Sequence, residues 1–394
     1  MGDTAGMSAD VFAALRALPG GAVVLDRLGA REDVWVVGGA VRDGLLGRPA
    51  KDLDLVVAGD AATLAADLGD VREVHDRFGT VTVLVGDAPV NVATARTETY
   101  AAPGALPDVR PGALEEDLAR RDFSVNAMAI DLAGGLHAAP GAQEDLAARR
   151  LRVLHDSSFT DDPTRLWRLA RYAARLGFAI EERTLELAKA AIADGALATV
   201  SGARIGNELA LALNEPEPLA ALAAAHELGL LPAGMAPRRG LTARALALLP
   251  EDGHPGILAL AACSGAVPEP RLRAWLDDLA VAARERDQLI AAATGAEPLA
   301  AALEAAQRPS EIHAAARGRQ PEHVALAGAL GPEQAARDWL ERLRDVRLEI
   351  SGDDLLAEGI PPGPEMGRRL DRALAAKLDG NAPDRAAELS AARA

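Results

Sequence analysis

Two aspartates, Asp52 and Asp54, stand two positions apart at the start of an apolar run that ends at Val57. Residues i and i+2 of a strand face the same side, so both carboxylates would project together. Hard divalent cations take oxygen ligands of this kind, and Mg2+ fits best. The pair therefore predicts a metal clamp. The alternative is an exposed strand edge, because a bare Asp-x-Asp is a short motif.

A glycine pair upstream of the aspartates is typical of a phosphate-binding turn. Gly38 and Gly39 follow an apolar run, and Arg42 lies in the helix predicted after them. Glycine lets a phosphate approach the backbone, the helix start offers N–H groups, and Arg42 adds positive charge. The turn precedes Asp52 by about 10 to 15 residues, which would let a triphosphate meet its metals. A ligand-free tight turn is the alternative, and the P-loop pattern is absent.

A third group of polar residues lies at 120–129, after an acidic stretch. We predict a helix here, on which Asp122 and Asn126 are four positions apart and share a face. Arg121 would contact phosphates, while Asp122 and Asn126 would bond ribose hydroxyls. The alternative is a solvated helix face with internal ion pairs.

A fourth group lies at 160–171, where Arg165, Arg168 and Arg171 recur every third residue and line one side of a predicted helix. Asp162 stands beside Arg165 at the helix start. One fixed Arg-plus-Asp pair complements the Watson–Crick edges of both cytosine and adenine, whereas uracil and guanine present the reversed pattern. The alternative is that Asp162 caps the helix ahead of Pro163 and that the arginines are solvated.

The elements that must position these residues form two halves. Up to about residue 140 we predict a small mixed sheet with helices. The strands are expected at 34–37, 52–57, 80–85 and 90–95, and the helices at 10–29, 40–46, 61–68 and 115–129. Residues 101–113 hold three prolines and should form a mobile loop.

The second half is expected to be all α. Ala- and Leu-rich segments predict helices at 163–177, 183–193, 203–213, 217–229 and 241–249. We find no repeat period that would indicate a solenoid.

Composition sets the remaining limits. A chain of 394 residues predicts two to three domains. The net charge of −16 argues against a generic polyanion binder, although local patches can override it. The single Cys263 excludes an intramolecular disulfide, and the scarcity of His argues against a metal phosphohydrolase. We expect a soluble, cytoplasmic protein without a membrane span, and no protein partner is implied.

The four groups, in this order, resemble the class II tRNA nucleotidyltransferases and the related bacterial poly(A) polymerases. Gly141 to Asp145 resembles the hinge of that family. The resemblance implies an α+β fold in which a catalytic nucleotidyltransferase head is followed by an all-α neck, body and tail. In such a fold the neck would recognise the nucleotide base and the tail would contact tRNA. The expected boundaries are 1–140, 141–215, 216–300 and 301–394.

The resemblance also implies an activity, the addition of C, C and A to the 3′ end of tRNA from CTP and ATP with release of pyrophosphate. Asp52 and Asp54 would hold two Mg2+ ions. Gly38, Gly39, Arg42 and Arg121 would contact phosphates, and Asp122 and Asn126 the ribose. Asp162 and Arg165 would read the base, and Arg168 and Arg171 would complete the nucleotide site.

Alternatives within the same chemistry are a poly(A) polymerase or an enzyme that adds only CC or only A. A non-catalytic RNA- or nucleotide-binding protein is the alternative from another class, and a metal-dependent hydrolase ranks third because no water-activating base accompanies the carboxylates.

The chain departs from the family pattern at three positions. Asp161 replaces the usual Glu, Ser124 replaces Thr, and Asn91 stands where a third acidic side chain is expected. We expect Asn91 to keep a carbonyl ligand for the metal while losing a charge. The loop at 97–112, with Arg96, Tyr100 and its prolines, resembles the flexible loop that such enzymes use when they switch from cytidine to adenosine addition.

Overall fold

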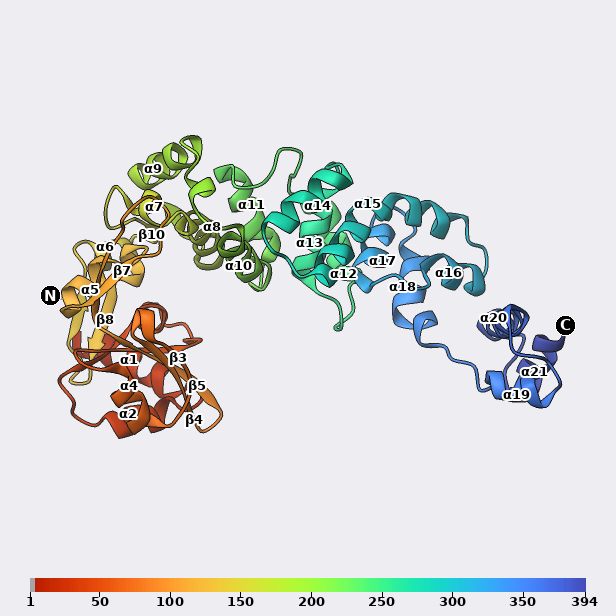
Figure 1. Cartoon of the computed structure of the whole chain (residues 1–394), viewed down its shortest axis with the longest axis horizontal. Coiled ribbons are helices and arrows are strands. Elements are labelled where there is room, and N and C mark those ends of the chain that lie inside the picture. The colour runs from red at the N-terminus through yellow and green to blue at the C-terminus, as the bar shows by residue number, and fades with distance from the viewer. Residues whose placement is uncertain (1–3) are drawn as a thin grey trace. The chain divides into compact units, whose positions relative to one another are not determined.

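The computed structural model describes residues 4–394, and its elements are labelled in Figure 1. Contacts between Cα atoms divide the chain into two compact units, one ending at Ser201 and one running from Gly202 to Ala394. Each unit is described by itself below. The finer division into neck, body and tail stays a prediction.

The N-terminal unit is built on a seven-stranded sheet with the strand order β3-β4-β5-β2-β1-β8-β9. Strands β2 and β5 are parallel and the other neighbours are antiparallel, which confirms the predicted mixed sheet. The strands are β1 (Val34–Val37), β2 (Leu53–Val57), β3 (Asp70–His75), β4 (Thr80–Val85), β5 (Ala88–Thr94), β8 (Met128–Asp131) and β9 (Leu136–Ala138).

Six helices accompany this sheet: α1 (Thr4–Arg16), α2 (Gly21–Leu28), α3 (Gly39–Leu45), α4 (Ala61–Leu68), α5 (Leu114–Ala119) and α6 (Ala142–Ala147). The predictions at 40–46 and 61–68 are confirmed. The single helix predicted at 10–29 is wrong, because the chain breaks into α1 and α2 at Gly20. Gly20 has a φ of 73°, and a Cβ there would lie 3.0 Å from the carbonyl oxygen of Val85.

The helix predicted at 115–129 is also wrong. Helix α5 ends at Ala119, a 3-10 turn covers Ser124–Asn126, and Met128 begins β8. Met128, Ala129 and Ile130 are all fully buried, and β8 pairs with β1. Three consecutive apolar side chains can all be buried in a strand covered on both faces, whereas successive positions on a helix turn toward solvent.

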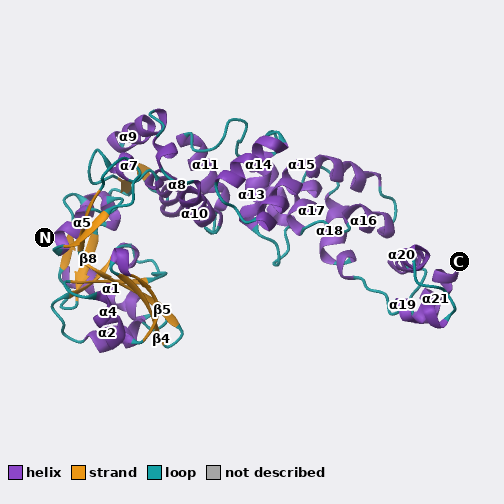
Figure 2. Cartoon of the chain, in the orientation of Figure 1, coloured by secondary structure: helices purple, strands orange, loops and turns teal. Residues whose placement is uncertain are grey.

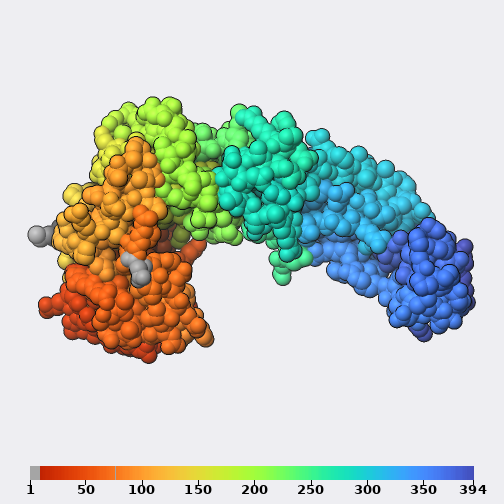
Figure 3. All heavy atoms as spheres, in the orientation of Figure 1, coloured from red at the N-terminus to blue at the C-terminus, as the bar shows by residue number. Residues whose placement is uncertain are grey.

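The segment predicted as a mobile loop contains a strand. β6 (Arg96–Thr99) pairs with β7 (Asp108–Pro111) in a two-stranded ribbon. Such a ribbon has no central strand, so it tolerates Pro111, which cannot donate a backbone hydrogen bond. The backbone N–H of Gly104 at the ribbon tip donates to the carbonyl of Thr160. Figure 3 shows the ribbon, in orange, against the yellow-green helical segment.

Beyond the sheet and the ribbon, the N-terminal unit contains α7 (Ser158–Asp161), α8 (Thr164–Leu176), α9 (Glu182–Ala193), a 3-10 turn at Ala196–Thr199 and a short strand pair. That pair is β10 (Arg150–Leu151) with β11 (Ala179–Ile180). These are the only named strands beyond residue 140 in the described residues, where the sequence predicts helices.

The C-terminal unit is helical throughout, as Figure 2 shows by colour. All five helices predicted beyond residue 160 are confirmed to within two residues at each end. The helices of this unit are α10 (Gly202–Leu213), α11 (Pro218–Leu228), α12 (Arg239–Leu248), α13 (Pro255–Ser264), α14 (Glu269–Asp278), α15 (Ala283–Ala305), α16 (Pro309–Ala316), α17 (Pro321–Gly328), α18 (Glu333–Glu341), α19 (Gly352–Ala357), α20 (Pro364–Leu378) and α21 (Arg385–Arg393). None of the helices in the described residues has the length and apolarity needed to traverse a lipid bilayer.

Candidate active site

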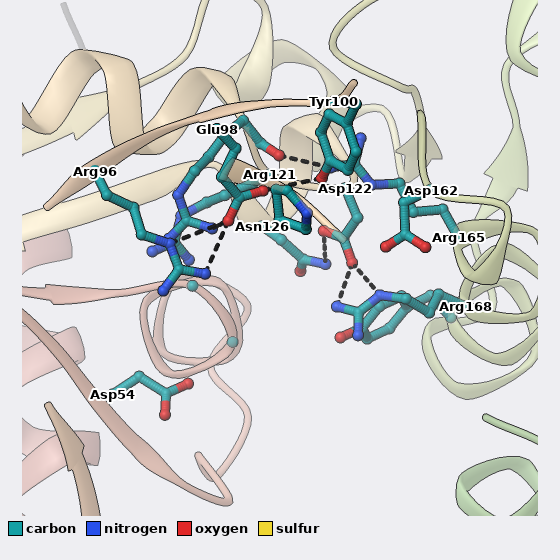
Figure 4. A pocket seen from close by; sticks show the side chains of 15 residues that line it. Asp54, Arg96, Glu98, Tyr100, Arg121, Asp122, Asn126, Asp162, Arg165 and Arg168 are labelled. Atoms are coloured by element: carbon teal, nitrogen blue, oxygen red, sulfur yellow. Dashed lines mark hydrogen bonds and ion pairs between the residues drawn. The ribbon is translucent and has the colours of Figure 1, made fainter. Parts of the chain in front are cut away.

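A polar pocket of about 380 Å³ lies within the N-terminal unit, between the sheet, the β6–β7 ribbon and α8. It brings together nine of the residues predicted from the sequence (Figure 4). These are Gly38, Gly39, Asp54, Arg121, Asp122, Asn126, Asp162, Arg165 and Arg168. The three remaining predicted residues, Arg42, Asp52 and Arg171, lie outside the lining.

Asp54 stands at one end of this pocket, on β2 and apart from the cluster of charged side chains in Figure 4. Burial raises its pKa, the amide of Asn91 and the charge of Arg121 act in the opposite direction, and the charge of Asp52 adds to the increase. Asp52 immediately precedes β2 and is exposed. The charge of Asp52 thus disfavours ionisation of Asp54, an effect that a bound cation would relieve.

Asn91 lies directly beside Asp54, because β2 and β5 pair in a register that joins these two residues. Its amide Nδ2 donates to Asp54 Oδ1 at 3.0 Å, and its Oδ1 accepts from Thr82 Oγ1 at 3.0 Å. The expectation that Asn91 offers a carbonyl ligand is wrong in this geometry, since the N–H side of the amide faces Asp54.

Gly38 and Arg121 face each other across the turn after β1. Gly38 has a φ of 71°, and a Cβ on it would lie 2.9 Å from Arg121 Nη1. The backbone conformation favours glycine, and a side chain here would displace the guanidinium of Arg121. Arg121 Nη2 donates to Asp117 Oδ2 at 2.9 Å, while its buried Nε has no hydrogen-bond partner. A buried N–H without a partner, at a turn free of side chain, fits an anionic ligand group.

Arg42 is buried beneath the pocket, with 1% of its surface exposed. Its Nε donates to Asp43 Oδ1 at 2.9 Å, and its Nη1 donates to Asn126 Oδ1. In this geometry Arg42 orients Asn126, and its buried guanidinium is not open to a phosphate. The cause is tertiary, because Asn126 is 84 positions away in the sequence.

Asp122 lines the pocket and accepts four hydrogen bonds. Its Oδ1 accepts from the backbone N–H of Phe123 at 2.8 Å and from Asn126 Nδ2 at 3.0 Å. Its Oδ2 accepts from Arg168 Nε at 2.9 Å and Nη2 at 2.6 Å. Burial would raise the pKa of Asp122, but Arg168 and Asn126 outweigh it and lower the pKa to about 2. Asp122 and Asn126, predicted to share the face of an α-helix, thus lie together although a 3-10 turn stands in place of that helix.

The aromatic ring of Tyr172 lies among three guanidinium groups. The central carbons of Arg42, Arg168 and Arg171 are 5.5, 5.8 and 4.9 Å from its centroid. Contacts of this kind restrict the orientation of the cations. Arg171 is therefore a neighbour of Tyr172 behind the pocket wall. The sequence reading missed Tyr172, since nothing in the spacing of one aromatic distinguishes it from a core residue.

Asp162 and Arg165 occupy the start of α8. Asp162 Oδ1 accepts from the backbone N–H of Thr164 at 3.2 Å and from its Oγ1 at 2.7 Å, so Asp162 does cap the helix. Arg165 donates to Ser158 Oγ and to the carbonyl of Arg120, both at 2.7 Å. Two of its five N–H groups are thereby engaged and the guanidinium is held rigidly in the pocket wall.

The β6–β7 ribbon contributes a carboxylate that the sequence reading missed. Glu98 accepts from Arg96 Nη2 at 2.8 Å, from Arg120 Nη1 at 2.9 Å and from the Tyr100 hydroxyl at 3.0 Å. Burial and the charge of Glu98 raise the pKa of Tyr100. The alternation of polar residues 96, 98 and 100 on one strand face was the signal available.

No group of three or more His, Cys, Asp or Glu side chains in the described part of the chain is arranged to hold a metal ion. The two carboxylates predicted as ligands, Asp52 and Asp54, would suit Mg2+, because this ion is usually bound by one or two carboxylates together with water and substrate phosphates.

Known proteins resemble the chain over both units. The family model described as the poly A polymerase head domain matches residues 34–152. An A-adding tRNA nucleotidyltransferase of Geobacter sulfurreducens is 35% identical over 389 residues, which cover 90% of this chain and 44% of that protein. A CC-adding tRNA nucleotidyltransferase of Deinococcus radiodurans is 34% identical over 358 residues, which cover 87% of this chain and 84% of that protein.

A CCA-adding enzyme of Thermotoga maritima complexed with tRNA has a similar structure, with a TM-score of 0.76 and 26% identity over 99% of this chain and 98% of that chain. The chain spans about half or less of the length of the first curated relatives that it matches. The Deinococcus relative, by contrast, is matched over 84% of its length. The chain therefore belongs to the family of tRNA nucleotidyltransferases.

Proposed function

We propose that the protein adds C, C and A to the 3′ end of tRNA from CTP and ATP. In each step the primer 3′-hydroxyl attacks the α-phosphorus of the nucleotide, the new phosphodiester bond forms, and the bond to pyrophosphate breaks. The observation that carries this proposal is the shared pocket, in which Asp54 lines one end and Asp162 and Arg165 line the other.

Asp52 and Asp54 would hold two Mg2+ ions, which when bound activate the primer hydroxyl and neutralise charge on the leaving pyrophosphate. Burial, with a smaller contribution from the charge of Asp52, raises the pKa of Asp54, and a bound cation would stabilise the ionised carboxylate. Gly38 and Gly39 give the triphosphate access to the backbone, and the unpartnered Nε of Arg121 is available to one of its oxygens. Arg42 acts through Asn126, which it orients.

The nucleotide base would be read by Asp162 and Arg165. Arginine supplies N–H donors and aspartate supplies an acceptor, which matches the acceptor and donor on the edges of both cytosine and adenine. Uracil or guanine would leave both protein groups unpaired, at about 1 to 3 kcal/mol for each buried group. Because one pair serves both correct bases, the pocket chemistry favours CCA addition over a single-nucleotide activity.

The relatives include A-adding and CC-adding enzymes, so the extent of addition needs a direct test. Purified protein is incubated with Mg2+ and with tRNA transcripts that lack CCA, CA or A, together with CTP, ATP or both, and the 3′ ends are sequenced. We expect CCA followed by arrest.

Other products would contradict this proposal in distinct ways. CC alone, A alone or a long A tail would each assign a different activity of the same family. No extension of any transcript would indicate a non-catalytic RNA-binding protein. The Asp87→Asn variant, altered at an exposed turn, serves as the active control.

A further inference from the structure

Three side chains form a row across neighbouring strands of the sheet, beside the pocket. Thr82 of β4 is paired in register with Asn91 of β5, and Asn91 is paired with Asp54 of β2. Two hydrogen bonds of 3.0 Å join the row, from Thr82 Oγ1 to Asn91 Oδ1 and from Asn91 Nδ2 to Asp54 Oδ1. All three residues are partly buried, which reduces competition from water for these bonds.

The direction of the hydrogen bonds in this row follows from which groups can donate a proton and which can only accept one. An ionised carboxylate only accepts, so Asp54 requires the N–H side of the Asn91 amide. The amide oxygen then points toward Thr82, whose hydroxyl has a proton to donate. Turning the amide over would place its oxygen against Asp54 Oδ1, acceptor against acceptor, and the carboxylate would lose its hydrogen bond from Asn91.

We propose that Asn91 is a positioning residue, which fixes the Asp54 carboxylate through Oδ1 and leaves Oδ2 for a divalent cation. Thr82 locks the amide in the required orientation. The site consequently operates with two carboxylates, Asp52 and Asp54, and with a neutral amide where a third acid would otherwise stand. This inference rests on the metal role of Asp54 in the proposed function.

The sheet register also predicts what an acid at position 91 would do. A carboxylate there would lie within hydrogen-bonding distance of Asp54 with no proton to donate, and the two anions would repel each other. A divalent cation between them would remove that repulsion, and cation affinity rises with the number of charged ligands. Asn91→Asp should therefore bind the cation more tightly than the natural chain.

The test measures binding of Mn2+ alone to the full-length protein, by electron paramagnetic resonance, without tRNA or nucleotide. Loss of a group that orients a metal ligand typically costs about 10- to 100-fold in metal affinity. We expect Asn91→Ala to weaken Mn2+ binding about 10-fold and Thr82→Val to weaken it about 3-fold, because the latter keeps the amide but frees it to turn. We expect Asn91→Asp to tighten binding about 10-fold.

Matched controls are Asn214→Ala in the C-terminal unit and Thr97→Val on β6, neither of which belongs to the row or lines the pocket. Thermal unfolding identifies any variant that fails to fold, and the Mg2+ concentration for half-maximal addition, measured beside kcat, separates metal affinity from other losses. Unchanged Mn2+ binding in Asn91→Ala would overturn the positioning role. Unchanged or weaker binding in Asn91→Asp would overturn the two-carboxylate assignment.

Asp54→Asn distinguishes these failures from failure of the proposed function. If Asp54→Asn loses Mn2+ binding while Asn91→Ala keeps it, the metal site stands and only the positioning role is rejected. If Asp54→Asn also binds Mn2+ as the natural chain does, the metal site itself is rejected.

Discussion

Asp54 and Asp122 line the same pocket, yet their surroundings shift the pKa values of the two carboxylates in opposite directions. Asp122 accepts four hydrogen bonds, two of them from Arg168, and its pKa is lowered to about 2. Asp54 accepts a hydrogen bond from Asn91, and burial together with Asp52 raises its pKa.

The difference separates two uses of a buried acid. A carboxylate whose charge is already balanced by protein donors is a rigid part of the wall, and it orients its partners. A carboxylate that is desolvated but poorly balanced gains most from a cation supplied with the substrate. The Asp122 carboxylate therefore helps to fix the shape of the pocket, whereas the Asp54 carboxylate is suited to bind a cation that takes part in the reaction.

The largest effect is expected from Asp54→Asn. The amide keeps the size of the side chain and removes the charge, so the stabilisation of several kcal/mol that a metal ion gives the transition state is lost. Nucleotide addition should fall by about 1000-fold or more, while nucleotide binding without metal survives. Single-turnover addition and equilibrium nucleotide binding measure the two quantities. An active Asp54→Asn enzyme would remove Asp54 from the chemistry, and Asp87→Asn should behave as the natural chain does.

Asp122→Asn should lower the free energy of unfolding and change how this free energy depends on pH. The folded pKa of about 2 lies below the ordinary value of 3.8. Asp122 therefore contributes stability that is present above about pH 4 and is lost as the pH falls toward 2. The difference corresponds to about 2 kcal/mol in the free energy of unfolding at neutral pH. Urea unfolding at pH 6 and pH 3 measures the free energy of unfolding of both proteins. The difference in this free energy between the natural chain and the variant should be smaller at pH 3 than at pH 6. A difference independent of pH would contradict the ionised state of Asp122.

Arg165→Ala tests whether the base-reading end depends on a fixed guanidinium. Without it, the penalty for a mismatched base edge falls, and discrimination against UTP and GTP should drop by about 10-fold. Incorporation of each of the four nucleotides into a transcript ending in CC measures this ratio. Equal losses for all four nucleotides, with unchanged discrimination, would show that Arg165 supports the pocket without reading the base.

The smallest effect is expected at Tyr172, whose ring lies among the guanidinium groups of Arg42, Arg168 and Arg171. Tyr172→Leu removes the aromatic face and should lower the free energy of unfolding by about 1 to 2 kcal/mol. Tyr172→Phe keeps the face and should stay close to the natural chain in the same thermal unfolding measurement. A Phe variant as unstable as the Leu variant would assign the effect to the hydroxyl group.

Much of the site was predictable because local patterns report on single elements. The strand at 53–57 and the turn at Gly38 follow from apolar runs and glycine, and both elements are present. Helix α8 and its capping residue Asp162 follow from helical spacing and the proline after the cap. The same patterns misassigned 115–129, since an apolar stretch that suits a helix also suits a strand buried on both faces.

The sequence by itself thus determined which residues carry the charges, turns and helix faces of the site, because these depend on neighbours a few positions away. Only the tertiary structure decided which charges are balanced. Asp54 meets Asn91 across 37 positions, Asp122 meets Arg168 across 46, and Arg42 meets Asn126 across 84. Burial and pairing between distant segments set the pKa and orientation of each group, and no periodicity within one element contains that information.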